Sequence, residues 1–528
     1  MPAREGTPPR IAWGRSRVWL PTAAEAGAID RAARDAAGVP ERVLMENAGR
    51  SAALLLAHAF PDGPVVAVVG SGSNGGDALV LLRSLKAWGR QVAWAATADA
   101  VPEPALAHGF DLPRVALSDP ALGRAAVLVD GILGTGARGA PRPAARAAIE
   151  AVNGAGRPVV ALDLPTGVDP DTGAIPGLAE SQAPEAASVR ADLTVCFGWP
   201  KRGLLRAPGR ARCGRLVAVE IGFPPAERPA GAEAITPQWA ETRLPPRPFG
   251  THKYEAGSLL VCAGRPGMAG AAILAARSAV RVGTGLVRVV SPEPNRAAIQ
   301  EAVPDALYVP REDAGAVREA VAASDALVVG PALGPGPQDA AFLRDVLGAA
   351  PALPAVLDAD ALTLIGAGAA RTGELAAGRQ IVLTPHPGEF RRLLGEDADE
   401  AVPDPVRAAG EFAEASGATV LLKGAPSVVA HPGEPVLVDA GGSADFAKAG
   451  MGDHLAGLIG GLLAQGAAPR DAAGVALALS GAAAARLGLS RGLSPADLAE
   501  AIAAVLGAPA AGGAPPAFPF LVFDQPAP

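Results

Sequence analysis

The sequence predicts an α/β protein with two domains, each built around a largely parallel β-sheet. Three observations support this fold class. The chain has 528 residues, which is long enough for more than one hydrophobic core. Short apolar runs alternate with helical patterns in two separate series. A proline-rich stretch with neither periodicity separates the two series.

The first series extends from Thr22 to about Phe223. Its apolar runs are continuous, as expected of parallel strands that helices cover on both faces. We therefore predict a doubly wound, Rossmann-like domain. The runs are 64–70, 91–97, 125–131, 157–163, 191–198 and 214–222.

The second series follows a segment, 222–250, in which prolines interrupt every possible element. Its apolar runs precede an expected β-hairpin at 427–441 and three helical patterns between Gly452 and Leu506. The runs are 257–264, 285–291, 325–331, 354–360, 380–386 and 418–424. The two series share no motif, so the sequence does not indicate a duplication. The expected organisation is a disordered tail (1–18), a first domain (19–223), a Pro-rich linker (224–236), a second domain (237–507) and a disordered tail (508–528).

Composition excludes several classes of protein. A net charge of −7 with only two short basic clusters gives no footprint for nucleic acid. Cys196, Cys213 and Cys262 are far apart and lack metal-site spacing, so we expect free thiols in a reducing cytoplasm. The N-terminus does not have the pattern of a secretory signal, and the apolar run 454–469 is too short and Gly-rich to span a bilayer. We therefore expect no membrane association.

In the first series, the apolar run 64–70 leads into a Gly-rich turn and then a helical pattern. Gly72, Gly75 and Gly76 allow close approach of a ligand, and the helix N-terminus offers N–H groups to an anion. The spacing is neither GxGxxG nor a Walker loop. Gly at such a turn is often only turn chemistry, so this loop alone is weak evidence.

Two further loops, 129–141 and 162–173, follow later strands of the same series. The carboxyl ends of parallel strands face one crevice, so polar side chains from all three loops are expected to converge. The group consists of Asn74, Asp77, Asp130, Thr135, Asp163 and Thr166. Its amide, carboxylate and hydroxyl oxygens suit a hard cation. The alternative is that Asp130 and Asp163 only cap their loops.

These loops, with LMENAGR (44–50) and TVCFGWPKRGLL (194–205), resemble the NAD(P)H-hydrate epimerases over residues 19–223. The resemblance implies that potassium binds to Asn74, Asp130 and Thr166, and that Asp163 and Lys201 take part in inverting the hydrated ring carbon. The implied hydrate-binding residues are Ser73, Asn74, Gly75, Gly76, Asp77, Gly134, Thr135, Gly136, Ala137, Arg138, Gly139, Ala140 and Asp163. Ser73 and Ala78 depart from the family's usual Asn and Gly, so we expect a retuned site. Met45, Glu46 and Asn47 lie on a predicted helix, where core packing or subunit contacts are expected.

The second series begins with a strand, a Gly-rich loop and a helix that has small residues on one face (252–292). Small residues permit either close helix packing or close ligand approach, and both interpretations stay open here. The loops 330–336 and 384–390 also follow predicted strands. His386 lies between two prolines in the second of these loops, where a lone His is more often structural than catalytic.

The segment Gly450-Met451-Gly452-Asp453 precedes an apolar helix, so the helix N-terminus offers N–H groups to an anion. An acidic residue in a first helical turn often only stabilises the helix. Lys423-Gly424 at the end of a strand, followed by a hairpin and then this segment, is the order of the ribokinase-like fold. In that fold the GxGD aspartate deprotonates the hydroxyl that accepts a phosphoryl group.

The motifs HKYEAG, GPALG, LTPHPGEF, LLKGAPSVV and GMGDHLAGLIGGLLAQG resemble the ADP- or ATP-dependent NAD(P)H-hydrate dehydratases over residues 237–507. The resemblance implies Asp453 as the base. The implied hydrate contacts are Ala271, Gly334, His386 and Asp453. The implied nucleotide contacts are Lys423, Gly424, Ala425, Pro426, Ser427 and Gly452. Ser443, Asp445 and Met451 depart from the usual Asn, Gly and Ser or Thr, and Asp445 adds negative charge near the expected phosphates.

Together the resemblances imply a cytoplasmic, bifunctional repair enzyme, expected to form a homo-oligomer. It would interconvert the R and S hydrates of NADH and NADPH (NADHX and NADPHX) and dehydrate the S form with ADP, giving AMP and phosphate. Magnesium is implied at the phosphates. One alternative is a vitamin-precursor kinase of the same fold with a non-catalytic N-terminal binding module. Another is a NAD-dependent dehydrogenase, which the missing GxGxxG disfavours.

Overall fold

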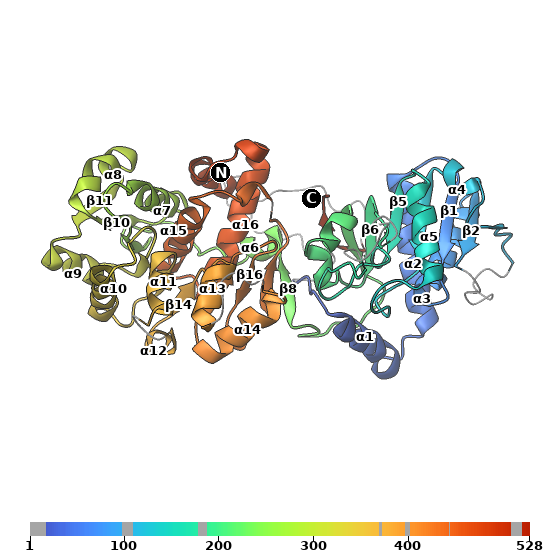
Figure 1. The fold of residues 1–528 in the computed structure, drawn as a ribbon, viewed down its shortest axis with the longest axis horizontal. Coiled ribbons are helices and arrows are strands. Elements are labelled where there is room, and N and C mark those ends of the chain that lie inside the picture. Colours follow the sequence, from blue (N-terminus) through green and yellow to red (C-terminus); the bar gives the residue numbers. More distant parts are fainter. Residues whose placement is uncertain are drawn as a thin grey trace. The chain divides into compact units, whose positions relative to one another are not determined.

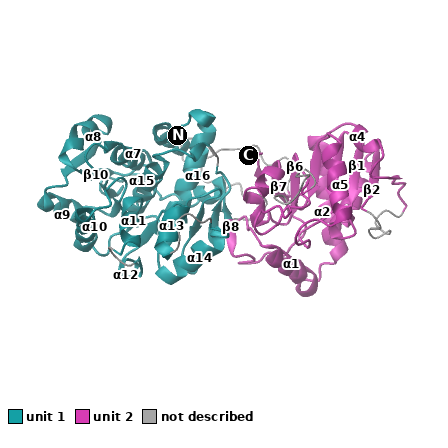
Figure 2. Ribbon diagram, viewed as in Figure 1, with its two compact units in different colours: residues 1–9, 234–512 teal, residues 10–233, 513–528 magenta. Residues whose placement is uncertain are grey.

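A computed structural model describes residues 17–97, 109–177, 187–368, 372–395, 402–442, 444–507 and 520–527. The chain divides into two compact units at residue 233 (Figure 2). We call them the N-terminal unit (magenta) and the C-terminal unit (teal). The C-terminal strand of the chain belongs to the N-terminal unit. Among the described helices, none has the length and apolarity needed to cross a membrane.

The N-terminal unit contains an eight-stranded sheet in the order β18-β7-β6-β5-β4-β1-β2-β3. All its neighbouring strands are parallel except β18, which runs antiparallel to β7. The strands are β1 (Val65–Val69), β2 (Val92–Ala96), β3 (Arg114–Val115), β4 (Val127–Gly131), β5 (Val159–Leu162), β6 (Leu193–Phe197), β7 (Arg215–Val219) and β18 (Leu521–Gln525). The chain order reverses between β1 and β4, which is where doubly wound sheets bind ligands.

Helices cover both faces of this sheet (Figure 1). Val65, Ala67 and Val69 of β1 pack in one core with α2 and α3, whereas Val66 and Val68 pack in the other with α5. This alternation is the burial pattern of a strand covered on both faces. The helices are α1 (Ala23–Arg31), α2 (Glu41–Ala59), α3 (Ser73–Ala87), α4 (Ala121–Arg124) and α5 (Pro143–Gly154).

The C-terminal unit contains a ten-stranded sheet in the order β11-β10-β9-β12-β13-β14-β15-β16-β17-β8. In this order, all neighbouring strands from β11 through β10 and β9 to β15 are parallel. Strand β16 is antiparallel to both of its neighbours, β15 and β17. The strands are β8 (Ala232–Ile235), β9 (Ser258–Cys262), β10 (Leu286–Ser291), β11 (Ala306–Pro310), β12 (Ala326–Val329), β13 (Ala355–Leu357), β14 (Ile381–Leu383), β15 (Thr419–Leu422), β16 (Val428–Ala430) and β17 (Val436–Asp439). The predicted hairpin at 427–441 is thus confirmed as β16 and β17.

The core on one face of this sheet is formed with α7, α15, α16 and α17. A Cβ atom on Gly457 of α15 would lie 2.1 Å from the Ala275 carbonyl oxygen of α7, so this glycine serves close helix packing. The helices are α6 (Pro237–Glu241), α7 (Ala269–Arg281), α8 (Arg296–Ala302), α9 (Ala314–Ala322), α10 (Pro337–Ala349), α11 (Asp360–Gly366), α12 (Thr372–Ala376), α13 (Pro387–Leu394), α14 (Pro405–Ser416), α15 (Met451–Ala464), α16 (Pro469–Leu487) and α17 (Pro495–Leu506).

Three expectations about the ends and the linker are corrected. The tail 508–528 contains β18, because Leu521, Val522 and Phe523 are buried against the edge of the sheet. The linker 224–236 contains β8, and α6 follows directly. Pro237 does not interrupt that helix but occupies its first turn, where a proline N–H is not needed, and Thr236 caps it. Of the tail 1–18, all but the last two residues lie outside the described residues.

Besides β8 and β18, two further strands, β3 and β11, were missed by the sequence analysis. Strand β3 has only two residues, too few to form a run. In β11 residues 306–309 are apolar, but only Ala306 is buried. Both lie at an edge of their sheet, where burial on both faces is not required.

Candidate functional site

In the N-terminal unit, the loop after β1 meets the loop after β4 at the reversal point of the sheet. Asn74, in the first turn of α3, donates from Nδ2 to the carbonyl oxygen of Leu133 at 3.1 Å. A Cβ atom on Gly75 would lie 2.1 Å from the Gly70 carbonyl oxygen, so only glycine fits there. Ala78, the departure from the family pattern, is fully buried and faces Gly131, whose missing side chain leaves room for the methyl group.

Asp130 and Thr166 join the loops after β4 and β5. The backbone N–H and the hydroxyl of Thr166 donate to the two carboxyl oxygens of Asp130, both at 2.8 Å. The Thr166 hydroxyl also accepts from the Leu133 N–H at 3.1 Å. Both side chains are fully buried. Burial raises the pKa of Asp130 to about 6, against the lowering effect of its hydrogen bonds.

Asp163, directly after β5, has a φ of 64°, which is strained for a residue other than glycine. Its Oδ1 binds the Lys201 ammonium group and accepts from the Phe197 N–H at 3.3 Å. Lys201 also donates to the Phe197 carbonyl oxygen at 3.2 Å. Both charged side chains are buried, so this ion pair is a fixed part of the site.

Asn74, Asp77 and Gly134 complete the same cluster. A Cβ atom on Gly134 would lie 3.4 Å from the Asn74 Cβ and 3.9 Å from the Asp163 Oδ2. Burial, and then the negative charge of Asp163, hold the pKa of Asp77 well above its usual value. The predicted convergence of the three loops is therefore observed for Asn74, Asp77, Asp130, Asp163 and Thr166.

The outer part of the loop after β4 does not join this cluster. Gly136, Arg138, Gly139 and Ala140 are exposed, and Thr135 and Ala137 are half-buried. The Arg138 guanidinium donates to the carbonyl oxygens of Thr135 and Ala137 within its own loop, at 2.7 and 2.9 Å. These residues are placed at the rim of the cluster. Ser73, at the first position of α3, is also exposed.

In the C-terminal unit, Asp453 is in the first turn of α15. Gly450 precedes the helix with a φ of 87°, and a Cβ atom there would lie 2.8 Å from Leu274 Cδ1. Within the part of the chain that the structure describes, the Asp453 carboxyl makes no hydrogen bond or ion pair. Burial, followed by the charge of Asp358, raises its pKa to about 6, whereas Lys423 lowers it. An unpartnered carboxyl with a raised pKa is suited to accept a proton.

Lys423, after β15, lies beside this turn. Its Nζ is 2.6 Å from the Asp358 Oδ1 and would be 3.1 Å from a Cβ atom on Gly452. Gly424 and Ser427 form the start of the following turn, with the Ser427 hydroxyl 3.2 Å from the Gly424 N. This places the predicted nucleotide-binding loop, residues 423–427, next to Gly452.

His386 caps α13. Its Nδ1 accepts from the Gly388 N–H at 3.1 Å, while Glu389 accepts from the His386 N–H at 2.9 Å. The imidazole is 55% exposed, and its Nε2 lies 3.5 Å from the Glu389 Oε1. Burial raises the pKa of Glu389, whereas the hydrogen bond from the His386 N–H and then the charge of Lys423 lower it.

Gly334 lies close to two acidic side chains, one of which binds its N–H group. Its N–H donates to the Asp360 Oδ2 at 2.8 Å, and a Cβ atom on it would lie 2.4 Å from the Asp339 Oδ2. Asp339 is in turn held by Arg311, at 2.6 Å. Ala271, the remaining predicted hydrate contact, is half-buried in the first turn of α7.

Sequence reasoning missed Asp358, Asp360 and Glu389 as parts of this site. A signal was present, because Asp358 and Asp360 lie at the carboxyl end of a predicted apolar run, as Asp130 and Asp163 do in the first domain. Three residues of this unit differ from the usual residues of the dehydratase family. Met451 is buried in the helical core, and Asp445 accepts a hydrogen bond from Ser490 at 3.4 Å. Ser443 lies outside the described residues.

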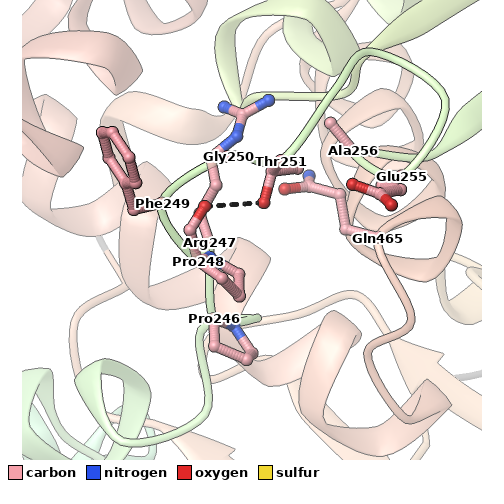
Figure 3. A pocket seen from close by; sticks show the side chains of 9 residues that line it. All are labelled: Pro246, Arg247, Pro248, Phe249, Gly250, Thr251, Glu255, Ala256 and Gln465. Carbon is pink, nitrogen blue, oxygen red and sulfur yellow. Dashed lines mark hydrogen bonds between the residues drawn. The ribbon is translucent and has the colours of Figure 1, made fainter.

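Two surface cavities of the C-terminal unit lie away from the Asp453 cluster. One, of about 440 Å³, is lined by residues 246–251, Glu255, Ala256 and Gln465 (Figure 3). Gln465 caps the C-terminus of α15, at the opposite end of that helix from Asp453. The other, of about 590 Å³, is lined by residues that precede β14 and β15, such as Gln380. Both cavities are thus at the amino ends of strands, where α/β sheets do not usually bind ligands.

The fold and the clusters define a two-site α/β enzyme, with each site at the carboxyl ends of parallel strands. A family model for NAD(P)H-hydrate dehydratases matches residues 259–504, and a model described as the N-terminus of YjeF-related proteins matches residues 41–203. The chain is 38% identical to the bifunctional NAD(P)H-hydrate repair enzyme of Salinibacter ruber over 529 residues, covering 91% of this chain and 95% of the relative. It is 34% identical to the enzyme of that name from Escherichia coli, covering 89% and 90%.

The chain therefore belongs to the family of bifunctional NAD(P)H-hydrate repair enzymes. The resemblance inferred from the motifs is confirmed, as are the two predicted fold classes, Rossmann-like and then ribokinase-like. Among solved structures, the ADP/ATP-dependent NAD(P)H-hydrate dehydratase from Bacillus subtilis, co-crystallised with ATP and Mg²⁺, is 29% identical with a TM-score of 0.46. That alignment covers 51% of this chain and 96% of the other.

Proposed function

We propose that this enzyme repairs hydrated nicotinamide cofactors: it interconverts the R and S forms of NADHX and NADPHX and dehydrates the S form with ADP. The observation that carries this proposal is the unpartnered Asp453 carboxyl at the N-terminus of α15. We assign the epimerase to residues 19–223 together with β18, and the dehydratase to residues 237–507.

In the dehydratase, Asp453 accepts the proton of the hydrate hydroxyl as its oxygen attacks the terminal phosphorus of ADP. A new O–P bond forms and AMP leaves. The ring C–O bond then breaks with its electron pair on phosphate, and loss of a proton from the adjacent ring carbon restores the double bond. Phosphate is a far better leaving group than hydroxide, which is why a kinase-like site can perform a dehydration.

The nucleotide is held by residues 423–427 and Gly452. Within the described part of the chain, the N–H groups of Gly452 and Asp453 have no acceptor, so they are free to bind phosphate oxygens. His386, Gly334 and Ala271 contact the hydrate. ADP is the preferred donor in this proposal, with ATP as the other candidate.

Magnesium is carried to the site by the phosphates of the nucleotide. The described residues contain no cluster of three or more His, Cys, Asp or Glu side chains that could hold a metal ion. A nucleotide-borne ion agrees with the usual behaviour of Mg²⁺, which takes few protein ligands and keeps substrate phosphates and water.

In the epimerase, the Asp163–Lys201 pair lies at the reacting carbon and moves or holds the proton during inversion. The residues predicted for potassium fit a monovalent cation, because the buried Asn74 Oδ1 has no hydrogen-bond partner and Asp130 supplies negative charge beside it. Asn74, Asp130 and Thr166 would hold the ion. The ion would supply positive charge that offsets the charge of Asp130.

We further propose a cytoplasmic homo-oligomer. Cys196, Cys213 and Cys262 are buried free thiols, as suits a reducing compartment. Sedimentation velocity of the purified chain tests the oligomer, with a single monomer peak as the contrary result.

The function is tested by incubating the protein with mixed NADH hydrates and ADP while following the absorbance of reduced nicotinamide. We expect full recovery of NADH, with AMP and phosphate as co-products. A stable phosphorylated product would indicate a vitamin-precursor kinase instead. Pure R hydrate that never yields the S form would make the N-terminal unit a non-catalytic binding module, and net oxidation of NADH would indicate a dehydrogenase.

A further inference from the structure

Lys423 lies between two carboxyl groups that compete for it. Its Nζ is 2.6 Å from the Oδ1 of Asp358, a residue that is only 1% exposed. The same Nζ, and the Asp358 Oδ2, would lie 3.1 and 3.4 Å from a Cβ atom on Gly452, the residue before Asp453. The lysine and both carboxyl groups therefore gather at the first turn of α15.

The lysine is bound by one of these carboxyl groups only. Asp358 holds it, whereas Asp453 has no ion pair among the described residues. The backbone of Asp358 is closely packed, because a Cβ atom on Gly330 would lie 1.9 Å from the Asp358 carbonyl oxygen. Ala359, the next residue, has a φ of 51°, a strained value that persists only where the surroundings impose it.

We propose that Asp358 is a positioning residue of the dehydratase: by binding Lys423 it keeps the ammonium group off Asp453, which stays free to accept the hydroxyl proton. This inference rests on the proposed function of the C-terminal unit. A lysine paired directly with Asp453 would stabilise its ionised form and make it a weaker base. Asp358 also places a negative charge near Asp453, which strengthens the base further.

Among the described residues, the other cation near this turn is Lys448, whose carbonyl oxygen accepts from the Met451 N–H at 3.4 Å and whose ammonium group is held by the carbonyl oxygens of Arg491 and Leu493. On α13, Glu389 is buried and feels the charges of Lys423 and Asp358, and its partner in the same turn is His386. On α7 and α17, Leu274 and Pro495 contact Gly450. On α16, Ser480 bonds to the ring of His454, the residue after Asp453, at 3.3 Å. Burial lowers the pKa of His454 to about 4, so that ring is neutral at working pH.

The test compares Asp358→Asn with the full-length enzyme, using S hydrate and ADP over a range of pH. We define the acid midpoint as the pH at which kcat falls to half on the acidic side. Because Asp358 raises the pKa of Asp453 and restrains the lysine that lowers it, we expect the acid midpoint to fall by about one pH unit. We expect kcat near neutral pH to fall about tenfold, with the KM for ADP unchanged.

A matched control is Asp325→Asn. That carboxyl accepts from the Ser258 N–H at 2.8 Å at the amino end of β9, on the side of the sheet away from Asp453. The acid midpoint of the Asp325→Asn variant should equal that of the unmodified enzyme. A second variant, Lys423→Met, should move the acid midpoint upward, and adding it to Asp358→Asn should reverse the downward shift.

The proposal is overturned if Asp358→Asn lowers kcat without moving the acid midpoint, or raises the KM for ADP with kcat unchanged. If Asp358→Asn does not fold, Lys423→Met decides, and an unmoved midpoint in that variant overturns the proposal. Failure of the unmodified enzyme to regenerate NADH would instead reject the proposed function, so the two failures are distinguishable.

Discussion

Thr166 donates both its backbone N–H and its hydroxyl to Asp130, from 36 residues further along the chain. This contact fixes the loop after β5 on the loop after β4, and Asp163 belongs to the first of these loops. The epimerase cluster is therefore held by tertiary contacts between loops, since no single loop carries the whole set. Its chemistry can be tested one side chain at a time.

Asp163→Asn should slow conversion of R to S hydrate by about a hundredfold while leaving dehydration of S hydrate intact. The amide cannot hold a proton or pair with Lys201 as a carboxylate does. The measurement is recovery of NADH from each pure epimer with ADP. Asp192→Asn is a control on the same sheet, because that carboxyl binds the Val159 N–H at the amino end of β5. Equal loss with both epimers would contradict the assignment.

Asp453→Asn should stop recovery of NADH from both epimers, with kcat reduced about a thousandfold, because the R form also passes through the S form. Conversion of R to S should continue. The measurement is absorbance recovery together with separation of the epimers by chromatography. Undiminished recovery from S hydrate would show that another group is the base.

The pH dependence follows from the raised pKa of Asp453. The base acts when ionised, so dehydration should rise with pH through about 6. The stability of the fold should instead fall as pH rises. The pKa of Asp453 is higher in the folded state than in the unfolded state, so its ionisation destabilises the fold. The destabilisation is complete above about pH 6 and absent below the unfolded pKa. Asp453→Asn should thus have a higher Tm than the unmodified enzyme at alkaline pH, and the difference should vanish near pH 4. A lower Tm at alkaline pH would contradict the burial argument.

Truncation after Gly507 removes β18 and should damage the N-terminal unit, although the cut lies in the sequence beyond the C-terminal unit. The variant loses the buried Leu521 and Phe523 and the ion pair between Arg215 and Asp524, at 2.6 Å. It also exposes the edge of β7, which favours aggregation. We expect the Tm of the epimerase transition to fall by about 5 °C, with dehydration of S hydrate retained. Calorimetry and the two epimer assays measure this, and loss of S dehydration alone would be the contrary outcome.

Gly457→Ala should destabilise the C-terminal unit by about 3 kcal/mol, because the new methyl group would overlap the Ala275 carbonyl oxygen. The matched control is Gly348→Ala in α10, where nothing lies within 4 Å of the added atom. That variant should gain up to about 1 kcal/mol from helix propensity. Urea unfolding of both variants measures the difference, and equal stabilities would show that α7 and α15 can separate without cost.

The sequence by itself determined the two parallel sheets, the helices that cover them and the family of the chain. Continuous apolar runs encode strands buried on both faces, and glycines at sharp turns encode the loops that approach ligands, as in 72–76 and 450–453. These signals are local, so they can be read without knowing which segments meet.

Only the tertiary structure decided which partners those segments have. Strand β18 belongs to the first sheet, Pro237 begins a helix, and Lys423 forms its ion pair with Asp358 and not with Asp453. Each of these depends on distances between residues that are far apart in the chain. Pairing of edge strands and of buried charges is set by packing and desolvation in three dimensions, and a linear pattern of residue types does not contain that information.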